Sequence, residues 1–540
     1  MRRSEDVADR GSRAGVLGRR GTQRRPFKGL RTREPCTAYD VVVIGAGIGG
    51  LFCAAKLAKE GLRVLLVERH YMVGGYCSTF RRRGYVFDAA TTFYPLLGNP
   101  STLTGKLLTE LGIETRWAKM DPVDAFHFPD GTRFTVPADF DTYRAKLDAS
   151  FPRQKASLER FFAAVRETYL KGLLCYFKGV DTARLGPWAG WTMRQALDHF
   201  FTDRKLKLLL TADCAHWGSP PSRTSFVFDS MLRLSYFLGN YYPEGGSQAF
   251  ADELARRFEQ LGGHILMATE AERILVRRGR VCGVRLRTTR GRLAGGRRIG
   301  AGAVVSNADL KLTYGKLLDA RWVAPELLDS LATMRSSYPC FLSHIGLQGV
   351  APESLERVQG YHWKAWDPDR VGQGGLLCKV VVPTRYEPRM APRGGQIVML
   401  QKVIEMDYRA VDDWAAHKAE VERRVTDHLE GLLPGIRDRI VVQTSASAHT
   451  SWRFTANEAG AMLGWEMSPD QLGERRPANH GPVDGLHLVG HWVRPGGGIT
   501  PVIVSAMQVA ETLVRARPPE RAEALLAALA PASGLRRLSI

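Results

Sequence analysis

Paired cysteines, long apolar runs and the common hydrolase motifs are all missing from this sequence. Its 540 residues contain no CxxC pair, which argues against a structural zinc site and predicts the reduced thiols of a cytosolic protein. Since no unbroken run of 18 apolar residues occurs, no transmembrane helix is predicted. HExxH and the GxSxG nucleophile elbow are missing too, and we predict no metal site. The eight cysteines are Cys36, Cys53, Cys77, Cys175, Cys214, Cys282, Cys340 and Cys378.

Acidic residues are outnumbered, with 55 Asp and Glu against 76 Lys and Arg, which gives a net charge of +21. Residues 1–36 hold 11 basic and 4 acidic groups, or +7 of that charge. The basic residues form no helical stripe with interleaved aromatics, so no nucleic-acid partner is predicted, whereas contact with an anionic membrane surface is compatible with the charge. We expect a disordered basic tail over 1–37 and a short C-terminal tail over 518–540.

The first clear motif is a β-branched run followed by closely spaced glycines. Residues 40–44 read DVVVI, as in a buried parallel strand, and 45–50 read GAGIGG, which satisfies GxGxxG. Helical composition follows as far as residue 60, and a second strand over 64–67 ends at an acid. We predict a dinucleotide site formed by Gly45, Gly47, Gly49, Gly50, Glu68 and the adjacent Arg69.

Each part of this motif has a physical task. Gly45 permits the tight turn, Gly47 lets the backbone approach a pyrophosphate, and Gly50 allows the helix to pack closely on the strand. The free N–H groups and partial positive charge of the helix N-terminus suit phosphates. Glu68 follows Gly45 by 23 residues, where a carboxylate accepts hydrogen bonds from the adenosine ribose. The motif is compatible with FAD and with NAD.

The next segments favour a flavin. Gly74 and Gly75 follow the second strand, and residues 84–88 read GYVFD. With these motifs the chain resembles the phytoene desaturase and carotenoid isomerase branch of the flavin amine-oxidase-like superfamily. The resemblance implies that Gly74 and Gly75 run along the phosphates and ribityl chain of FAD. It covers about residues 39–515, with its specific motifs in three separate patches.

The middle of the chain supplies the second patch. Residues 242–247 read YPEGGS, and we predict Ser247 as the N-cap of a helix that ends at residue 261. Strands are predicted over 264–267, 271–276 and 281–286, and another over 303–308. The resemblance implies that the backbone near Ala271 lies beside the adenine.

The third patch is a strand, a glycine turn and an apolar helix near the C-terminus. The strand ends at Gly490, and residues 495–499 read PGGGI. The resemblance implies that this helix N-terminus, with Gly497, Gly498 and Ile499, faces the N1/O2 edge of the flavin. Family members usually have Gly-Asp where this chain has Gly490-His491. We interpret His491 as a cofactor contact or a structural residue, with the role of catalytic base as a weaker alternative.

These patches predict an α/β fold of the flavin amine-oxidase type, with a discontinuous Rossmann-type FAD-binding domain and an α+β substrate or lid domain. The first domain is assigned to 38–100, 240–310 and 480–517, and the second to 101–239 and 311–479. In the second, strands are predicted over 340–349, 376–383 and 396–404, and an amphipathic helix over 412–433. The aromatics that crowd its first part are interpreted either as ordinary core or as the lining of an apolar tunnel: Phe161, Phe162, Trp188, Trp191, Phe226 and Phe228.

The leading functional hypothesis is an FAD-dependent oxidoreductase that acts on a lipophilic polyene or isoprenoid, removing hydride from an activated C–H to flavin N5. The sequence has no evident acid–base constellation, and such chemistry does not require one, because the flavin carries the redox step. Polyene cis–trans isomerisation, saturation of a double bond as in retinol saturase relatives, amine oxidation, and an FAD-binding scaffold without turnover are the alternatives. The motifs identify no electron acceptor. We expect a cytoplasmic protein in peripheral contact with the membrane.

Overall fold

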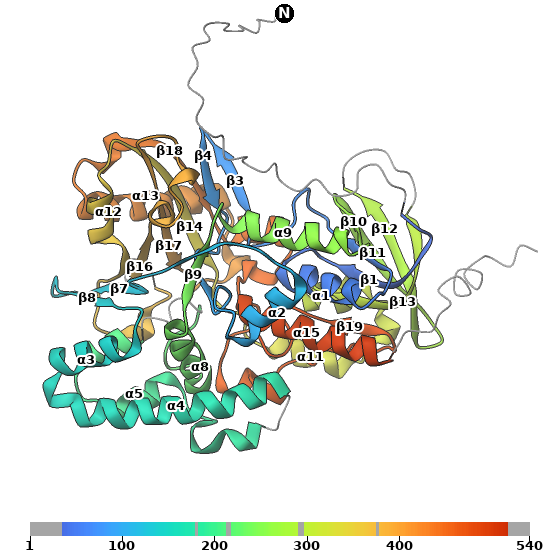
Figure 1. The fold of residues 1–540 in the computed structure, drawn as a ribbon, viewed down its shortest axis with the longest axis horizontal. Coiled ribbons are helices and arrows are strands. Elements are labelled where there is room, and N and C mark those ends of the chain that lie inside the picture. Colours follow the sequence, from blue (N-terminus) through green and yellow to red (C-terminus); the bar gives the residue numbers. More distant parts are fainter. Residues whose placement is uncertain (1–34, 179–181, 212–217, 290–295, 374–376, 517–540) are drawn as a thin grey trace, which may run out of the picture.

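The computed structural model describes residues 35–178, 182–211, 218–289, 296–373 and 377–516. The predicted tails over 1–37 and 518–540 therefore lie outside the described residues, save for residues 35–37. Two large sheets stand side by side, and a group of helices lies below the second of them (Figure 1). The domain boundaries proposed from the sequence stay a prediction.

The first sheet has a parallel core extended by an antiparallel ribbon. Its strand order is β10-β2-β1-β13-β12-β11, and β19 pairs with β13. Every neighbouring pair is parallel except β11 with β12 and β12 with β13. A parallel sheet covered on both faces requires apolar strands, and all four residues of β2 are buried. The strands are β1 (Ala38–Ile44), β2 (Val64–Val67), β10 (His264–Leu266), β11 (Thr269–Arg277), β12 (Arg280–Thr288), β13 (Arg297–Ser306) and β19 (Leu486–Leu488).

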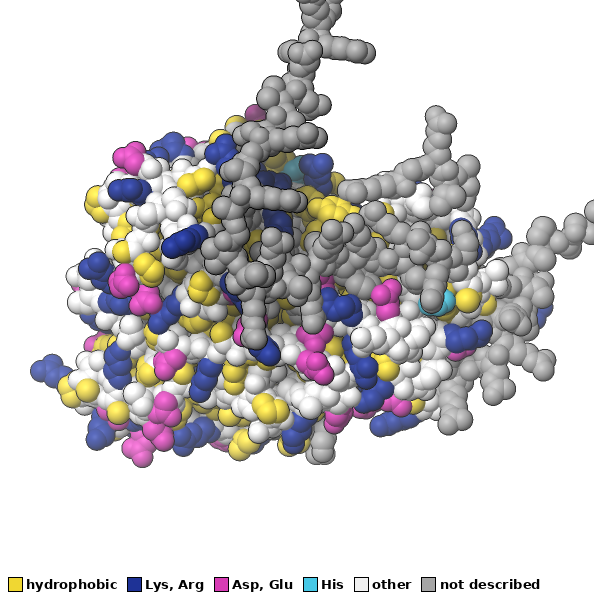
Figure 2. Space-filling view, turned by 45° about the horizontal axis from the view of Figure 1, so that its top comes forward, with side chains coloured by type: hydrophobic (Ala, Val, Ile, Leu, Met, Phe, Trp, Pro, Cys, Tyr) yellow, Lys and Arg dark blue, Asp and Glu magenta, His cyan; other side chains and the backbone are white. Residues whose placement is uncertain are grey.

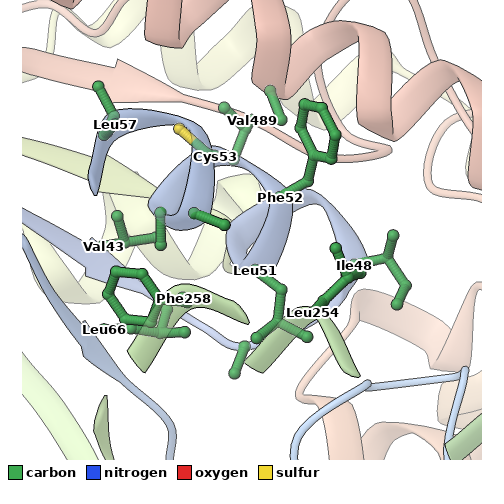
Figure 3. Close-up of a cluster of buried hydrophobic side chains, with 14 of the residues drawn as sticks. Val43, Ile48, Leu51, Phe52, Cys53, Leu57, Leu66, Leu254, Phe258 and Val489 are labelled. Atoms are coloured by element: carbon green, nitrogen blue, oxygen red, sulfur yellow. The ribbon is translucent and has the colours of Figure 1, made fainter. Parts of the chain in front are cut away.

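Three helices cover one face of this sheet: α1 (Ile48–Lys59), α9 (Ser247–Gln260) and α15 (Ile499–Ala516). Figure 3 shows the buried cluster around α1, in which Leu51 and Phe52 meet side chains from the sheet, from α9 and from the segment after β19. Among the described helices, α15 alone is long and apolar enough to cross a membrane by composition. It packs against α1 instead, with Ile503, Ala506 and Val509 buried, as a core helix does.

The predicted N-cap of α9 is wrong. Gly246, with φ of 80°, occupies the cap position, and Ser247 is the first helical residue. The helix start is satisfied from outside, because the Ser247 N–H donates to Asp88 Oδ1 over 2.8 Å. Sequence reasoning missed this because the acceptor lies 159 residues away.

The second sheet has the order β18-β14-β17-β16-β15-β7-β8 and is antiparallel except between β15 and β7. One face packs on α13 (Trp414–Leu432), close to the helix predicted over 412–433. The strands expected over 340–349, 376–383 and 396–404 are confirmed as β14, β16 and β17. The strands are β7 (Asp124–His127), β8 (Arg133–Val136), β14 (Cys340–Gln348), β15 (Gly360–Trp363), β16 (Leu377–Val381), β17 (Gly395–Val403) and β18 (Ile440–Ala446).

A helical group lies beside the second sheet and shares a core with it. Phe161, Phe162 and Phe226 are buried there, as ordinary core residues. The group consists of α3 (Phe140–Ser150), α4 (Lys155–Lys178), α5 (Met193–Phe200), α6 (Arg204–Leu210) and α8 (Phe226–Phe237). Smaller elements complete the fold: α2 (Leu103–Leu111), α10 (Leu310–Leu312), α11 (Pro325–Thr333), α12 (Pro352–Val358), α14 (Ala448–Thr455), β3 (Thr79–Arg82), β4 (Tyr85–Asp88), β5 (Tyr94–Pro95), β6 (Trp117–Lys119) and β9 (Asn240–Pro243).

Candidate cofactor and substrate site

The turn from β1 to α1 is built on glycines whose positions forbid side chains. Gly45 has φ of +93°, which side chains disfavour. Gly47 is the N-cap of α1 and has no side chain that could accept a hydrogen bond. The first N–H groups of the helix therefore have no side-chain cap and can bind a ligand. A Cβ at Gly50 would lie 2.0 Å from the Gly45 carbonyl oxygen, so only glycine lets α1 start this close to β1.

Glu68 ends β2 and faces the glycine turn. Its Oε2 accepts from the Ala46 N–H over 2.8 Å and its Oε1 from the His70 N–H over 2.7 Å. Burial raises the pKa of this carboxyl, against these two hydrogen bonds, which lower it. A carboxylate held in this way is poised to accept hydrogen bonds from a sugar. The neighbouring Arg69 donates to the carbonyl of Arg453 over 2.9 Å, which ties the β2 end to α14.

The paired glycines lie directly against the first glycine turn. Gly74 has φ of +109° and donates its N–H to the Ala46 carbonyl over 2.8 Å. Gly75 has φ of +60°, and a Cβ there would lie 3.4 Å from the Gly47 Cα. Two chain segments therefore present bare backbone to the same space, as the close passage of a diphosphate requires.

The C-terminal motif closes the same space from the other side. Gly490 has φ of +99° and Gly498 has φ of +108°, just before α15 begins at Ile499. A Cβ at Gly497 would lie 2.3 Å from the Leu463 carbonyl oxygen, so this turn also excludes side chains. The start of an 18-residue helix brings N–H groups and partial positive charge to a ligand held here.

Asn307 was missed as a site residue by the sequence reasoning, although it stands at the end of a predicted strand. Its side chain fills the junction between the glycine segments. A Cβ added at Gly47 would lie 3.0 Å from an atom of the Asn307 side chain, one at Gly49 would lie 2.8 Å from it, and one at Gly490 would lie 2.6 Å from it. The Asn307 backbone N–H also donates to the Ile44 carbonyl over 2.8 Å. The signal that could have found it is its position at the carboxyl end of a strand next to β1.

His491 lies against the cavity as a neutral imidazole. Burial, and then the Arg476 guanidinium, lower the pKa of His491 to about 3. Arg476 is itself buried and donates to the His491 carbonyl over 2.7 Å. A neutral ring donates or accepts a hydrogen bond, but its low pKa makes it a poor proton acceptor near neutral pH. This favours the cofactor-contact role over that of a catalytic base.

These segments open on one cavity of about 590 Å³. Of the predicted site residues, only Gly50 is absent from its lining, which fits its role in packing. The structure brings the other thirteen together: Gly45, Gly47, Gly49, Glu68, Arg69, Gly74, Gly75, Ala271, Gly490, His491, Gly497, Gly498 and Ile499. The bare backbone, the two helix starts and the ribose acid suit an FAD molecule, with no side chain of the glycine turns in its path.

The cavity continues beyond the glycine turns into an apolar chamber. One face of the second sheet forms its floor, with Leu342, Gln401 and Ala446 in the lining. Leu173 of α4 and Phe228 of α8 contribute from the helical group. The sequence allowed Phe228 to be either an ordinary core residue or part of a tunnel lining. In the structure it borders the chamber. The same cavity holds the glycine turns and a space suited to an apolar substrate.

Such a fold and cavity define a flavin-dependent oxidoreductase. The profile of the flavin containing amine oxidoreductase family matches residues 48–514, and the chain belongs to that family. It is thus an FAD-dependent oxidoreductase, and the predicted fold class, cofactor and enzyme class are confirmed.

The curated relatives come from the predicted branch of the family. The chain is 26% identical to prolycopene isomerase 1, chloroplastic, of an Oncidium hybrid cultivar, over 88% of this chain and 84% of the relative. It is 28% identical to the all-trans-zeta-carotene desaturase of Myxococcus xanthus, over 89% and 94%. It is 28% identical to the lycopene-forming phytoene desaturase of Pseudescherichia vulneris, over 88% and 98%. The resemblance stated from the motifs is therefore confirmed.

Solved structures share the fold. An oxidoreductase from Methanosarcina mazei aligns with a TM-score of 0.63 at 19% identity, over 87% of this chain and 99% of that one. Wild-type putrescine oxidase bound to putrescine aligns with a TM-score of 0.62 at 15% identity, over 89% and 100%. At these identities the likeness concerns the fold alone.

Proposed function

We propose that this oxidoreductase desaturates a lipophilic polyene or isoprenoid. Hydride leaves an activated C–H for the bound flavin, a proton leaves the neighbouring carbon to solvent, and a double bond forms between the two carbons. The observation that carries the proposal is the single cavity that joins the glycine turns to the apolar chamber. A long apolar chain in this chamber would be held against the cofactor by burial of its surface rather than by ion pairs. The names of the relatives, which include carotenoid desaturases, support the same substrate class.

The protein's own contribution is orientation and exclusion of water. When bound, FAD supplies the hydride acceptor, N5. The start of α15 lies where its N–H groups would stabilise negative charge on the cofactor. His491 stays neutral and so does not compensate that charge with its own. Leu342 and Phe228 give the chamber apolar walls, which would orient a bound polyene and shed water from its surface.

Isomerisation of a polyene double bond is the second candidate. Its support is that relatives named prolycopene isomerase match as much of the chain, at 26% identity, as the desaturases do at 28%. Both reactions fit a chamber whose described lining is largely apolar, because the flavin carries the redox step. Saturation of a double bond, amine oxidation and a flavoprotein scaffold without turnover are the further alternatives that the experiment separates.

An absorbance spectrum of the purified protein, followed by anaerobic titration with an acyclic polyene, tests the proposal. Desaturation predicts that the flavin bands bleach stoichiometrically while the polyene spectrum shifts to the red. A changed polyene isomer with no net bleaching identifies an isomerase. Pre-reduced flavin that reoxidises as the polyene shifts to the blue identifies a saturase. No reaction with any polyene, together with bleaching by an amine, would show that the substrate is an amine and not a polyene. Bound flavin that reacts with neither polyene nor amine would identify a scaffold without turnover.

We also propose that this enzyme is cytoplasmic and that it rests on an anionic membrane at the α4 side of the chamber. Leu170 and Leu174 are 64% and 51% exposed, while Tyr169 and Leu173 of the same helix line the cavity. Figure 2 brings the top of Figure 1 forward, and over the uncovered part of that face basic, acidic and hydrophobic side chains are interspersed. At α4, the two exposed leucines would enter the lipid, so the apolar contact would carry the binding.

Flotation with vesicles of phosphatidylcholine, with and without phosphatidylglycerol, tests this contact. Leu170→Glu combined with Leu174→Glu should abolish flotation, whereas Leu328→Glu, at an exposed leucine of α11, should leave it unchanged. Equal flotation of all three proteins would refute the α4 contact.

A further inference from the structure

A single row of side chains crosses the chamber floor. Strand register places Ala446 opposite Leu342, Leu342 opposite Gln401, Gln401 opposite Lys379, and Lys379 opposite Tyr361. All five line the cavity. Because neighbouring strands lie about 4.8 Å apart, the row is about 19 Å long.

The row changes from apolar to polar along its length. At one end, Leu342 packs in a cluster with Ala446 and with Tyr76, which directly follows the paired glycines. Gln401 and Lys379 follow, and Tyr361 ends the row; Lys379 and Tyr361 also border a smaller adjoining pocket. Along the row, Leu342 therefore packs against the segment that follows the paired glycines, and Lys379 lies two strands further away.

The two polar side chains retain hydrogen-bonding capacity. Lys379 Nζ donates to Asp124 Oδ2 over 2.6 Å and lies 4.3 Å from the Tyr361 ring centroid. This leaves N–H groups of the ammonium without an oxygen partner among the described residues. The Gln401 amide makes only a 3.5 Å contact to Thr92 Oγ1 and a 3.3 Å contact to Met399 Sδ. Gln401 is 9% exposed, so bulk water cannot fully satisfy it.

The chemistry of this end disfavours a pure hydrocarbon. A hydrocarbon that covered Lys379 and Gln401 would shut solvent away from their N–H groups without offering an acceptor, which is costly in a buried site. An oxygen atom would accept from both side chains. Asp124 already balances the charge of Lys379, so the site suits a neutral oxygen rather than a second carboxylate.

On the basis of the proposed function, we propose that the substrate is an oxygenated polyene. Its hydroxyl or carbonyl oxygen lies at the end remote from the glycine turns and accepts hydrogen bonds from Lys379 and Gln401. These two residues therefore fix how far the chain enters the chamber and which bond faces the cofactor. They act in specificity and positioning.

Binding of matched polyenes to the FAD-loaded enzyme tests this inference. The probes are lycopene, its 1-hydroxy derivative, and a terminal aldehyde and a terminal acid of the same skeleton. Binding of each probe is measured by the quenching of tryptophan fluorescence. The hydroxyl and aldehyde forms should bind wild type about tenfold more tightly than the hydrocarbon. Lys379→Met and Gln401→Leu should each reduce this ratio towards one. Lys402→Met, a buried lysine of β17 outside the cavity lining, should preserve it.

The outcomes separate this inference from the proposed function. If no polyene binds wild type, the proposed function fails. If all four probes bind wild type equally, the function stands and the oxygenated end group is refuted. Tightest binding of the acid would also overturn the neutral-oxygen preference. Lys379→Met removes the ion-pair partner of Asp124 and so could fail to fold. In that case the effect of Gln401→Leu on the binding ratio tests the inference, because this substitution breaks no ion pair.

Discussion

The side chain of Asn307 occupies the space that a side chain at Gly490 would need: a Cβ at Gly490 would lie 2.6 Å from Asn307 Oδ1. Gly490 also has φ of +99°. The contact joins the end of β13 to the C-terminal glycine motif, so the two halves of the cofactor site are held in register at this point.

Gly490→Ala should therefore weaken both folding and FAD retention. Left-handed strain and the clash with Asn307 together should cost about 2–4 kcal/mol in free energy of unfolding. Adding Asn307→Gly to the Gly490→Ala variant should restore the stability lost through the clash. The stability lost through the left-handed φ at residue 490 should not return. Urea unfolding and the flavin-to-protein absorbance ratio measure both. A double variant no better than Gly490→Ala would show that the clash is unimportant.

Gly50→Ala should be more damaging, although Gly50 does not line the cavity. The added Cβ would lie 2.0 Å from the Gly45 carbonyl oxygen, which belongs to the turn itself and cannot move aside without opening the site. We expect apoprotein with a lowered melting temperature. Gly431→Ala, inside α13 with open space around it, is the matched control and should be neutral or stabilising by about 0.5–1 kcal/mol. Normal FAD content in Gly50→Ala would contradict the packing role.

Local motifs explain what could be predicted from the sequence. The turn at Gly45 and Gly47 and the acid Glu68 are set by a strand, a turn and a helix adjacent in the chain. The chamber floor is different, because Lys379 and Gln401 become neighbours only when β16 and β17 pair within a sheet whose strands come from distant segments. No periodicity in one segment encodes that register. The sequence did not predict Asn307 as a site residue for the same reason, because the glycines that it contacts belong to two other motifs.

Glu68→Gln should reduce FAD affinity more than it reduces stability. Gln offers one acceptor oxygen where the carboxylate offers two, so it cannot accept from Ala46 and His70 while also serving the ribose. We expect the Kd for FAD to rise about tenfold or more, measured by flavin fluorescence during titration of apoprotein. Glu60→Gln, in an exposed pair with Lys56, should leave the Kd unchanged. An unchanged Kd in Glu68→Gln would remove this residue from the site.

Acid should destabilise the protein through His344. This residue of β14 is 1% exposed, and neither ring nitrogen has a hydrogen-bond partner within the described residues. Burial lowers the pKa of His344 from its ordinary 6.5 to about 4. The unfolded chain therefore binds a proton between these values while the folded chain does not, so stability present above pH 6.5 is lost as the pH falls towards 4. The full loss corresponds to about 3 kcal/mol.

His344→Met should flatten this dependence, because methionine fills a similar apolar space and does not titrate. Urea unfolding at pH 7 and at pH 5 measures the difference, which should be smaller in the variant than in wild type. His417→Met, at a partly exposed histidine of α13, is the control and should keep the wild-type slope. Other histidines whose pKa is lowered, the buried His362 and the half-buried His428 among them, contribute with the same sign, so some acid sensitivity should remain in His344→Met. An undiminished slope in that variant would mean that His344 is already protonated, or solvated, in the folded protein.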